Sequence, residues 1–350
     1  MSARRVVLTF DYELYFGRSG TPRRCLLEPT DALLAELDDL DAPGCFFVDA
    51  AYLLRVLEEP RAVEDARLVT DQLQRVVAGG HRIELQMHPH WLDAVWLGDG
   101  RWVFPTYRYY QLRSLGRERA VDLVVATTEA MAQIAREVDP GYAVQAYRAG
   151  GFCAQPFQMI GEAMEAAGLT IDSSVAAGTV ARTATHSFDY RDAPQRACWR
   201  FDTDPLTPAP GGRFAEVPVS STRVGPLTRL RRRWEMLRNP GSYERFGDGT
   251  HMPGYSTLLG KILPSQTLLA VESTSPDLLR SILAGAADAV TLIGHPKSMS
   301  PVSLAALRAL AEDGVRFMHL ADLVAECADS TSSASSPSDA DLATPPGGRD

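Results

Sequence analysis

The segment Val6-Val7-Leu8-Thr9-Phe10 is a short apolar run of strand character, and the acidic residues Asp11 and Glu13 follow it directly. Similar pairs of an apolar run and a polar signature recur along the chain: IELQM before His88-Pro89-His90, AVQAY before Arg148-Ala149-Gly150-Gly151, LTI before Asp172-Ser173-Ser174, AEV before Pro218, and VTLIG before His295-Pro296. The C-terminal ends of successive parallel strands meet at one mouth of an α/β barrel. The ordered set therefore predicts a site at that mouth, and its acids, imidazoles and arginine indicate metal-assisted hydrolysis.

Strand-like and helix-like stretches alternate along most of the chain, which is typical of an α/β fold. The patterns predict strands at 5–10, 45–48, 82–87, 143–147, 169–171, 214–219, 289–293 and 315–318, and helices at 29–40, 64–78, 117–138, 156–167, 276–287 and 302–312. We expect an insertion at 223–265, with a basic helix at 228–238 and a Gly-rich loop after it. Polar and small residues dominate 328–350, which predicts a disordered tail after a folded domain at 1–327.

Composition excludes several classes of protein. A chain of 350 residues is long enough for one α/β barrel. Its net charge of -9 argues against general nucleic-acid binding, because attraction to phosphate requires the opposite sign. No apolar run approaches the roughly 20 residues of a spanning helix, and the first strand begins too early for a signal peptide. The five cysteines are scattered without a CxxC pair, so we expect reduced thiols and a cytoplasmic location.

The acidic and imidazole pairs share one spacing. Asp11 and Glu13 are two residues apart, as are His88 and His90, so each pair addresses one side of an extended chain. Alone, the acidic pair would suit a solvated turn, and the histidine pair would suit a surface loop. Together, Glu13 and the two histidines would supply three ligands and leave a position for water, the usual arrangement of a catalytic zinc ion.

Arg148, Asp172 and His295 could each have a structural or a catalytic role, and their surroundings in the fold decide which. The guanidinium of Arg148 matches a carboxylate in geometry, either to orient a catalytic acid or to form a structural ion pair. Asp172 begins a segment that by itself resembles a structural Asx or Ser turn. His295 is either a core or rim residue or a general acid, the role that histidine commonly takes at neutral pH.

The ordered motifs TFDYE, MHPH, YRAGG, DSS and IGHP resemble those of the polysaccharide deacetylase family, carbohydrate esterase family four. The resemblance covers residues 6–323 apart from the insertion. It implies a distorted (β/α) barrel of about seven parallel strands. It also implies a hydrolase that removes N- or O-acetyl groups from a carbohydrate or glycoconjugate, and a divalent metal, Zn²⁺ or else Co²⁺ or Ni²⁺.

Carried over to this chain, the resemblance assigns roles to individual residues. Asp11 would be the general base, Arg148 would orient it, His295 would be the general acid, and Asp172 would support His295. The expected metal ligands are Glu13, His88 and His90. The same motifs supply the expected substrate-binding residues: Tyr12, Trp91, Gly150, Gly151 and Ser173.

Two departures from the family pattern affect the metal ligands. Tyr12 stands where the family has a second aspartate, so Glu13 must supply the carboxylate. The usual His-x-x-x-His pair puts Gln86 opposite His90, and His88 would have to replace the missing imidazole. These departures keep two alternatives open: hydrolysis of another C–N bond on the same barrel, and a binding or scaffold protein whose metal site has decayed.

Two further clusters have a plain and a functional interpretation. Aromatic residues crowd the segment after the histidines: Trp91, Trp96, Trp102, Phe104, Tyr107, Tyr109 and Tyr110. They form either a platform for sugar rings or a loop packed onto the barrel. The arginines between Arg229 and Arg238 form either a solvated helix face or a surface for an anionic glycan, a lipid-linked phosphate or peripheral membrane contact.

Overall fold

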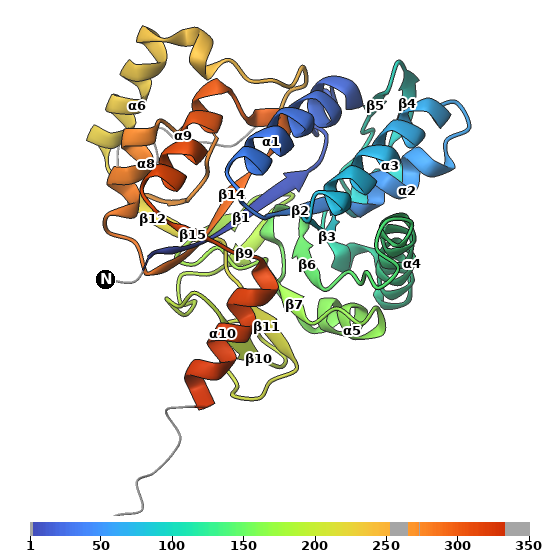
Figure 1. Ribbon diagram of the computed structural model, residues 1–350. Helices are drawn as coiled ribbons and strands as arrows, with labels where there is room; N and C mark the ends of the chain where they lie inside the picture. Colours follow the sequence, from blue (N-terminus) through green and yellow to red (C-terminus); the bar gives the residue numbers. More distant parts are fainter. Residues whose placement is uncertain (1–2, 253–264, 273, 333–350) are drawn as a thin grey trace, which may run out of the picture.

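The structure is a computed structural model that describes residues 3–252, 265–272 and 274–332 (Figure 1). The strands of its central sheet are β1 (Arg5–Tyr12), β2 (Gly44–Asp49), β3 (Arg82–Met87), β6 (Ala146–Ala149), β7 (Ile171–Asp172), β10 (Trp199–Phe201), β11 (Phe214–Glu216), β14 (Ala289–Gly294) and β15 (Arg316–Phe317). Their order is β10-β11-β7-β6-β3-β2-β1-β14, and β15 pairs with β1. All neighbours from β11 to β14 are parallel, whereas β10 is antiparallel to β11.

Backbone hydrogen bonds beyond these ladders join the two ends of the parallel run. After β11, Val219 N donates to Val175 O at 2.9 Å, and Ser220 N donates to Thr291 O of β14 at 3.0 Å. Leu269 N then donates to Ser220 O at 2.7 Å. Because β11 and β14 lie at opposite ends of the parallel run, these bonds curl it into a distorted barrel. The predicted fold class is confirmed.

Helices surround the barrel (Figure 1). They are α1 (Glu28–Asp39), α2 (Ala50–Glu58), α3 (Val63–Ala78), α4 (Arg117–Arg136), α5 (Gln158–Ala166), α6 (Pro226–Arg238), α8 (Pro276–Leu283), α9 (Pro301–Glu312) and α10 (Leu320–Ser332). Neighbouring helices pack on one another, with α4 against α2, α3 and α5, and α9 against α1 and α8. Local signals start several of them: α9 begins at Pro301 after a capping box between Ser300 and Ser303.

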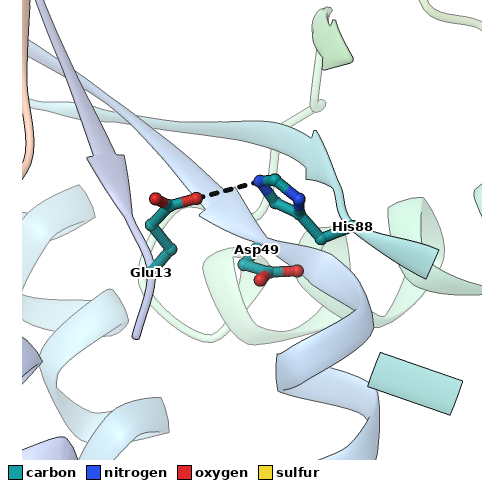
Figure 2. A group of neighbouring side chains, drawn as sticks. All are labelled: Glu13, Asp49 and His88. Atoms are coloured by element: carbon teal, nitrogen blue, oxygen red, sulfur yellow. Dashed lines mark ion pairs between the residues drawn. The ribbon is translucent and has the colours of Figure 1, made fainter. Parts of the chain in front are cut away.

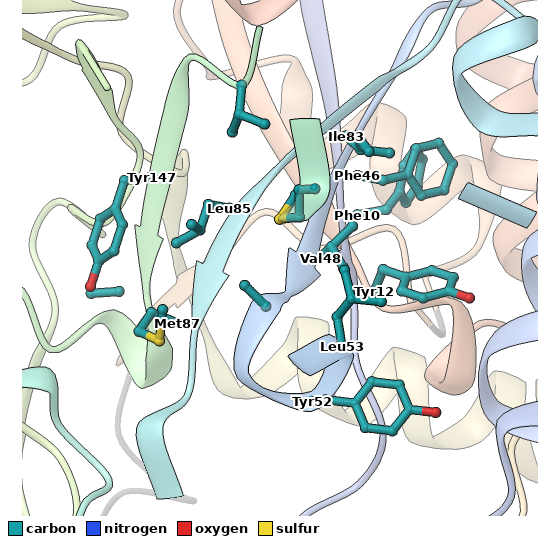
Figure 3. Close-up of a cluster of buried hydrophobic side chains, with 14 of the residues drawn as sticks. Phe10, Tyr12, Phe46, Val48, Tyr52, Leu53, Ile83, Leu85, Met87 and Tyr147 are labelled. Atoms are coloured by element: carbon teal, nitrogen blue, oxygen red, sulfur yellow. The ribbon is translucent and has the colours of Figure 1, made fainter. Parts of the chain in front are cut away.

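Alternation along β1 places the site residue Asp11 inside the barrel. Leu8 and Phe10 belong to the large core cluster that is buried beneath the helices (Figure 3). Val7 points to the opposite side and joins a smaller cluster that includes Leu323 of α10. Because side chains alternate with a period of two, Asp11 shares the interior side with Val7.

In the described part of the chain, three antiparallel two-stranded sheets lie outside the central sheet: β4 (Val95–Gly98) with β5 (Arg101–Val103), β8 (Val180–Arg182) with β9 (Ser187–Asp189), and β12 (Ser221–Val224) with β13 (Ser265–Leu268). The expected basic helix is present as α6, between β12 and β13. Residues 253–264 of the Gly-rich loop expected after it lie outside the described residues. The tail was expected to be disordered from residue 328, but α10 continues to Ser332, and 333–350 lie outside the described residues.

The cysteines differ from the expectation of free thiols. Cys198, just before β10, and Cys327 of α10 are joined by a disulfide with their Cα atoms 6.4 Å apart. Cys25, Cys45 and Cys153 are free and buried. The expectation of reduced thiols is therefore wrong for one pair, and the cytoplasmic location loses that support. Among the described residues, no helix combines the length and the apolar character needed to cross a bilayer.

Candidate active site

The strand ends bring five of the predicted residues to one mouth of the barrel. Asp11 is in β1 and Glu13 follows it, His88 follows β3, Arg148 is in β6, and His295 follows β14. Parallel strands place their C-terminal ends at the same rim, which is why residues far apart in sequence meet there. They form one continuous set of ion pairs.

Asp11 is held by groups from two other strands. Nη1 of Arg148 donates to its Oδ1, and Nε2 of Gln86 donates to its Oδ2 at 3.0 Å. Arg148 is completely buried. Its other nitrogens donate to Thr9 Oγ1 at 3.1 Å and to Ser173 O and Oγ at 3.0 and 2.9 Å. A guanidinium engaged in so many directions cannot swing away, so it fixes the orientation of the carboxylate.

His295 connects Asp11 with the outside of the site. Its Nε2 lies 3.6 Å from Asp11 Oδ2 and 3.5 Å from Glu13 Oε1, while its Nδ1 is hydrogen-bonded to Glu272 Oε1. Burial alone would lower the pKa of His295, but the carboxylate of Glu272 raises it to about 9. The imidazole is therefore a proton donor at neutral pH. Its side chain is 25% exposed, against 4% for Asp11, so a ligand reaches His295 first.

Glu13 is paired with Lys297 and with the imidazole of His88. Nζ of Lys297 donates to its Oε1 at 2.8 Å and to the carbonyl oxygen of Leu14 at 2.6 Å. Nε2 of His88 lies 3.0 Å from its Oε2 (Figure 2). Burial alone would raise the pKa of Glu13, but Lys297 and His88 hold it well below its usual range. Burial opposes protonation of His88, yet its contact with Glu13 raises the imidazole pKa.

The donor atoms that suit a divalent cation come from Glu13, Asp49 and His88. One ligand atom from each lies within 4.8 Å of the others, and all three residues are buried (Figure 2). Nδ1 of His88 has no hydrogen-bond partner in the described part of the chain. Lys297 occupies only one oxygen of Glu13, so the other remains directed at His88. Carboxylate oxygens and an imidazole are suitable ligands for zinc, and the residues therefore fit such an ion.

Asp49, the third member of that group, also has structural contacts. Its side chain caps α2 by accepting from Tyr52 N at 3.4 Å, and Nε1 of Trp91 donates to its Oδ2 at 2.5 Å. Burial raises the pKa of Asp49 to about 7. The carboxylate is thus held in place before any ion arrives.

His90 is not among the residues whose donor atoms lie within 4.8 Å of one another, although its ring centroid lies 5.5 Å from that of His88, and its role as a ligand stays a prediction. The imidazole is completely buried in an aromatic box, stacked on Tyr110 with centroids 5.3 Å apart and packed 5.0 Å from Phe104. Burial lowers its pKa well below the usual value. Trp102 and Trp91 are also buried nearby, so this aromatic loop mainly packs onto the barrel.

Asp172 does not support His295, whose Nδ1 partner is Glu272. Oδ1 of Asp172 instead accepts a hydrogen bond from Ser174 Oγ at 2.5 Å, and the carboxyl of Glu216 nearby is also completely buried. Burial raises the pKa of Asp172 to about 6, and burial together with Asp172 raises that of Glu216 well above its usual range. Burial therefore favours the protonated form of both carboxyl groups.

The residues expected to bind substrate have other positions. Tyr12 is completely buried, and its hydroxyl donates to Gln72 of α3. Trp91 and Ser173 are completely buried too. These three side chains therefore do not reach the mouth, and their predicted substrate contacts are corrected here.

The Gly-Gly turn has a steric role beside His88. A Cβ on Gly150 would lie 2.5 Å from His88 Nδ1, closer than a side chain can approach. Gly151 has φ +59, and a Cβ there would lie 2.8 Å from the hydroxyl of Tyr110. The turn thus lets the backbone run against the imidazole.

The sequence analysis missed three carboxylates of the site. Two of them directly follow an apolar run, which is the pattern that identified the other site residues. Asp49 directly follows the apolar run Cys45-Phe46-Phe47-Val48, and Glu272 directly follows Leu268-Leu269-Ala270-Val271. The third, Glu216, lies inside the short strand β11.

A cavity of about 380 Å³ adjoins Glu272 on the side of α6 and α8. Arg229 and Arg232 line it together with apolar side chains such as Leu278. Its volume is within the range of small-ligand sites. Glu272 therefore lies between this cavity and the His295 imidazole.

Comparisons with known proteins give low similarity. No family model matches the chain, and no curated protein matches it. The solved structures it resembles include a protein of Mycobacterium smegmatis described as a polysaccharide deacetylase, with 15% identity, a TM-score of 0.47, and coverage of 95% of this chain and 92% of that one. A 4-α-glucanotransferase of Thermococcus litoralis has 10% identity and a TM-score of 0.47, covering 93% of this chain and 41% of that one.

A family 4 acetyl xylan esterase of Clostridium thermocellum, solved with a cobalt ion, has 12% identity and a TM-score of 0.39 and covers 92% of this chain and 91% of that one. Other similar structures are peptidoglycan deacetylases and family 4 carbohydrate esterases. At these identities and TM-scores, the similarities support no conclusion about function. The function is therefore inferred from the geometry and chemistry of the site.

Proposed function

We propose that the protein is a metal-dependent hydrolase that removes an acetyl group from a carbohydrate or glycoconjugate. The observation that carries the proposal is the arrangement of Asp11 and His295: a carboxylate and a protonated imidazole meet at 3.6 Å on the rim of the barrel. A binding protein needs no such acid and base pair. Acyl transfer to water needs both, one to take a proton from the water and one to protonate the leaving atom.

Asp11 is placed to act as the base. Arg148 occupies its Oδ1, so the other oxygen, which accepts from Gln86 and faces His295, is the one directed at the mouth. The buried Arg148 keeps this oxygen in one position throughout the reaction.

His295 is placed to act as the acid. Glu272 holds Nδ1, which leaves Nε2 to donate its proton to the leaving amine or alcohol. The partial exposure of the ring allows contact with a substrate that enters from outside. Glu272 is a positioning residue, because it acts through His295.

The proposed metal site consists of Glu13, Asp49 and His88. A Zn²⁺, Co²⁺ or Ni²⁺ ion held there would polarise the acyl carbonyl as a Lewis acid. Asp49 is a member of this group that the sequence analysis had not named.

The test is acetate release from a panel of N- and O-acetylated mono- and oligosaccharides, measured with metal-depleted protein and after addition of each ion. We expect Asp11→Asn and His295→Gln each to lower kcat on the order of 10²–10⁴-fold. His319→Gln is the matched control, since this residue lies next to α10, away from the mouth, and should retain full activity.

Metal analysis separates the parts of the proposal. Bound metal should fall in Glu13→Ala and His88→Ala and should persist in His90→Ala. If no substrate is hydrolysed with any of the three ions, the hydrolase proposal is wrong. If hydrolysis is confirmed and Asp11→Asn remains fully active, the assignment of the base is wrong.

Two other functions remain as second candidates. The panel should include small amides, because a hydrolase of a different C–N bond would cleave these and not the acetylated sugars. A non-hydrolytic glycan-binding protein is favoured by the pairing of Glu13 with Lys297, which neutralises the carboxylate without an added ion. Calorimetric binding of an oligosaccharide with no product in mass spectra would support that function.

A further inference from the structure

The helix α6 carries an apolar surface that the site does not use. Its exposed apolar side chains are Leu227 (81%), Leu230 (63%), Trp234 (54%) and Leu237 (73%). None of its residues is buried, and it lies at the edge of the molecule beside α8 (Figure 1). Large apolar side chains grouped on one exposed face are uncommon in soluble proteins and mark a contact surface.

These four residues form one stripe. At about 100° per residue, they fall within an arc of about 80° around the helix axis. We call them the α6 stripe. The same spacing places Arg231 and Arg238 along one border of the stripe and Arg233 along the other.

The opposite side of α6 attaches the helix to the protein. Glu235 accepts hydrogen bonds from Ser275 Oγ at 2.7 Å and Tyr243 OH at 3.0 Å. Thr228 and Arg232 line the cavity beside α8. Since these contacts are on the side away from the α6 stripe, they direct the stripe outward.

Charge indicates what the stripe contacts. The helix holds five arginines, Arg229, Arg231, Arg232, Arg233 and Arg238, and the single acid Glu235, in a chain of net charge -9. The guanidinium of Arg238 also lies 3.9 Å from the ring centroid of Trp234. Aliphatic and indole side chains bordered by arginine are suited to the boundary between acyl chains and anionic headgroups. A second copy meeting through the same stripe would bring two arginine-rich helices together, which like charges disfavour.

We propose that α6 is an interfacial helix that attaches the protein to a bilayer containing anionic lipids. The stripe enters the headgroup region, and the bordering arginines contact lipid phosphates. Attachment at this place would hold the mouth of the barrel near a membrane surface. The inference does not depend on the proposed acetyl hydrolysis, because vesicle binding is measured without any substrate.

The test is co-flotation with vesicles of phosphatidylcholine alone and with vesicles that also contain phosphatidylglycerol. We expect binding to the anionic vesicles only, weakened by added salt because the attraction is electrostatic in part. Trp234→Ala with Leu237→Ala should abolish binding. Replacing Arg231, Arg233 and Arg238 by glutamine should lower the partition coefficient about fivefold per arginine.

Val63→Ala and Leu97→Ala are matched controls, since these apolar residues are also exposed (67% and 63%) but lie outside α6. They should leave binding unchanged, and urea unfolding should show that every variant is folded. Equal binding to both kinds of vesicle, or full binding by the Trp234→Ala Leu237→Ala variant, would overturn the proposal. A dimer in light scattering that the same variant disperses would overturn it too. So would the absence of binding to either kind of vesicle.

Discussion

Replacing Lys297 by methionine tests the electrostatic balance of the site without knowledge of the substrate. The ammonium is 1% exposed and donates to Glu13 Oε1 and to the carbonyl oxygen of Leu14. Methionine preserves most of the side-chain volume and removes the charge. The carboxylate of Glu13 then keeps the imidazole of His88 at 3.0 Å as its nearest partner.

The expected loss of stability follows from these contacts. Removing one member of a buried ion pair costs about 3–5 kcal/mol, because the other charge stays buried without compensation. The loss of a hydrogen bond to a buried carbonyl adds about 1 kcal/mol. Since His88 can neutralise part of the charge on Glu13, we expect about 3 kcal/mol, a large share of the roughly 5–15 kcal/mol that stabilises a folded protein.

Urea unfolding near neutral pH in the presence of a chelator measures this loss without a contribution from bound metal. A double-mutant cycle with Glu13→Gln isolates the pair, and we expect a coupling energy of about 1–3 kcal/mol. Arg280→Met is the matched control. Its guanidinium makes an exposed ion pair with Asp313, also at 2.8 Å, and should contribute less than about 1 kcal/mol.

A loss of less than about 1 kcal/mol in the free energy of unfolding of Lys297→Met would refute a buried, stabilising ion pair. The ion pair would also be refuted if the losses of unfolding free energy in Lys297→Met and Glu13→Gln add up in the double mutant within about 0.5 kcal/mol. Either result would mean that solvent reaches the pair and screens it, contrary to its burial in the structure.

Two further substitutions test the walls of the site. Arg148→Lys removes the fork that holds Asp11, so urea unfolding should show a loss of about 2–4 kcal/mol, and acetate release should fall even where the protein remains folded. For the pair of Asp172 and Glu216, burial raises both pKa values, so above about pH 4 the folded protein binds more protons than the unfolded chain. Stability then falls as pH rises, and Glu216→Gln should flatten the pH dependence of the unfolding free energy above about pH 4. An unchanged slope would contradict the raised pKa of Glu216.

Much of the fold could be predicted from local patterns. Apolar runs such as 6–10 and 289–293 have strand character in any context, and their regular alternation with amphipathic stretches leads to a parallel α/β barrel. The disulfide between Cys198 and Cys327 left no local trace, because its partners are 129 residues apart in the sequence.

The sequence by itself determined which residues stand at the ends of the strands. Asp11, Glu13, His88, Arg148 and His295 meet in the structure because the C-terminal ends of parallel strands share one rim. The meeting of these residues can therefore be predicted from the sequence, because each motif directly follows a strand-like run.

Only the tertiary structure decided which partner each of these residues has. Spacing suggested Glu13, His88 and His90 as metal ligands, and the fold adds Asp49, whose donor atom lies close to those of Glu13 and His88, while it packs His90 among aromatic rings. Glu272 supports His295, because the loop after β13 crosses the end of β14. The physical reason is that ion pairing and desolvation depend on distances in three dimensions, between groups that are far apart along the chain.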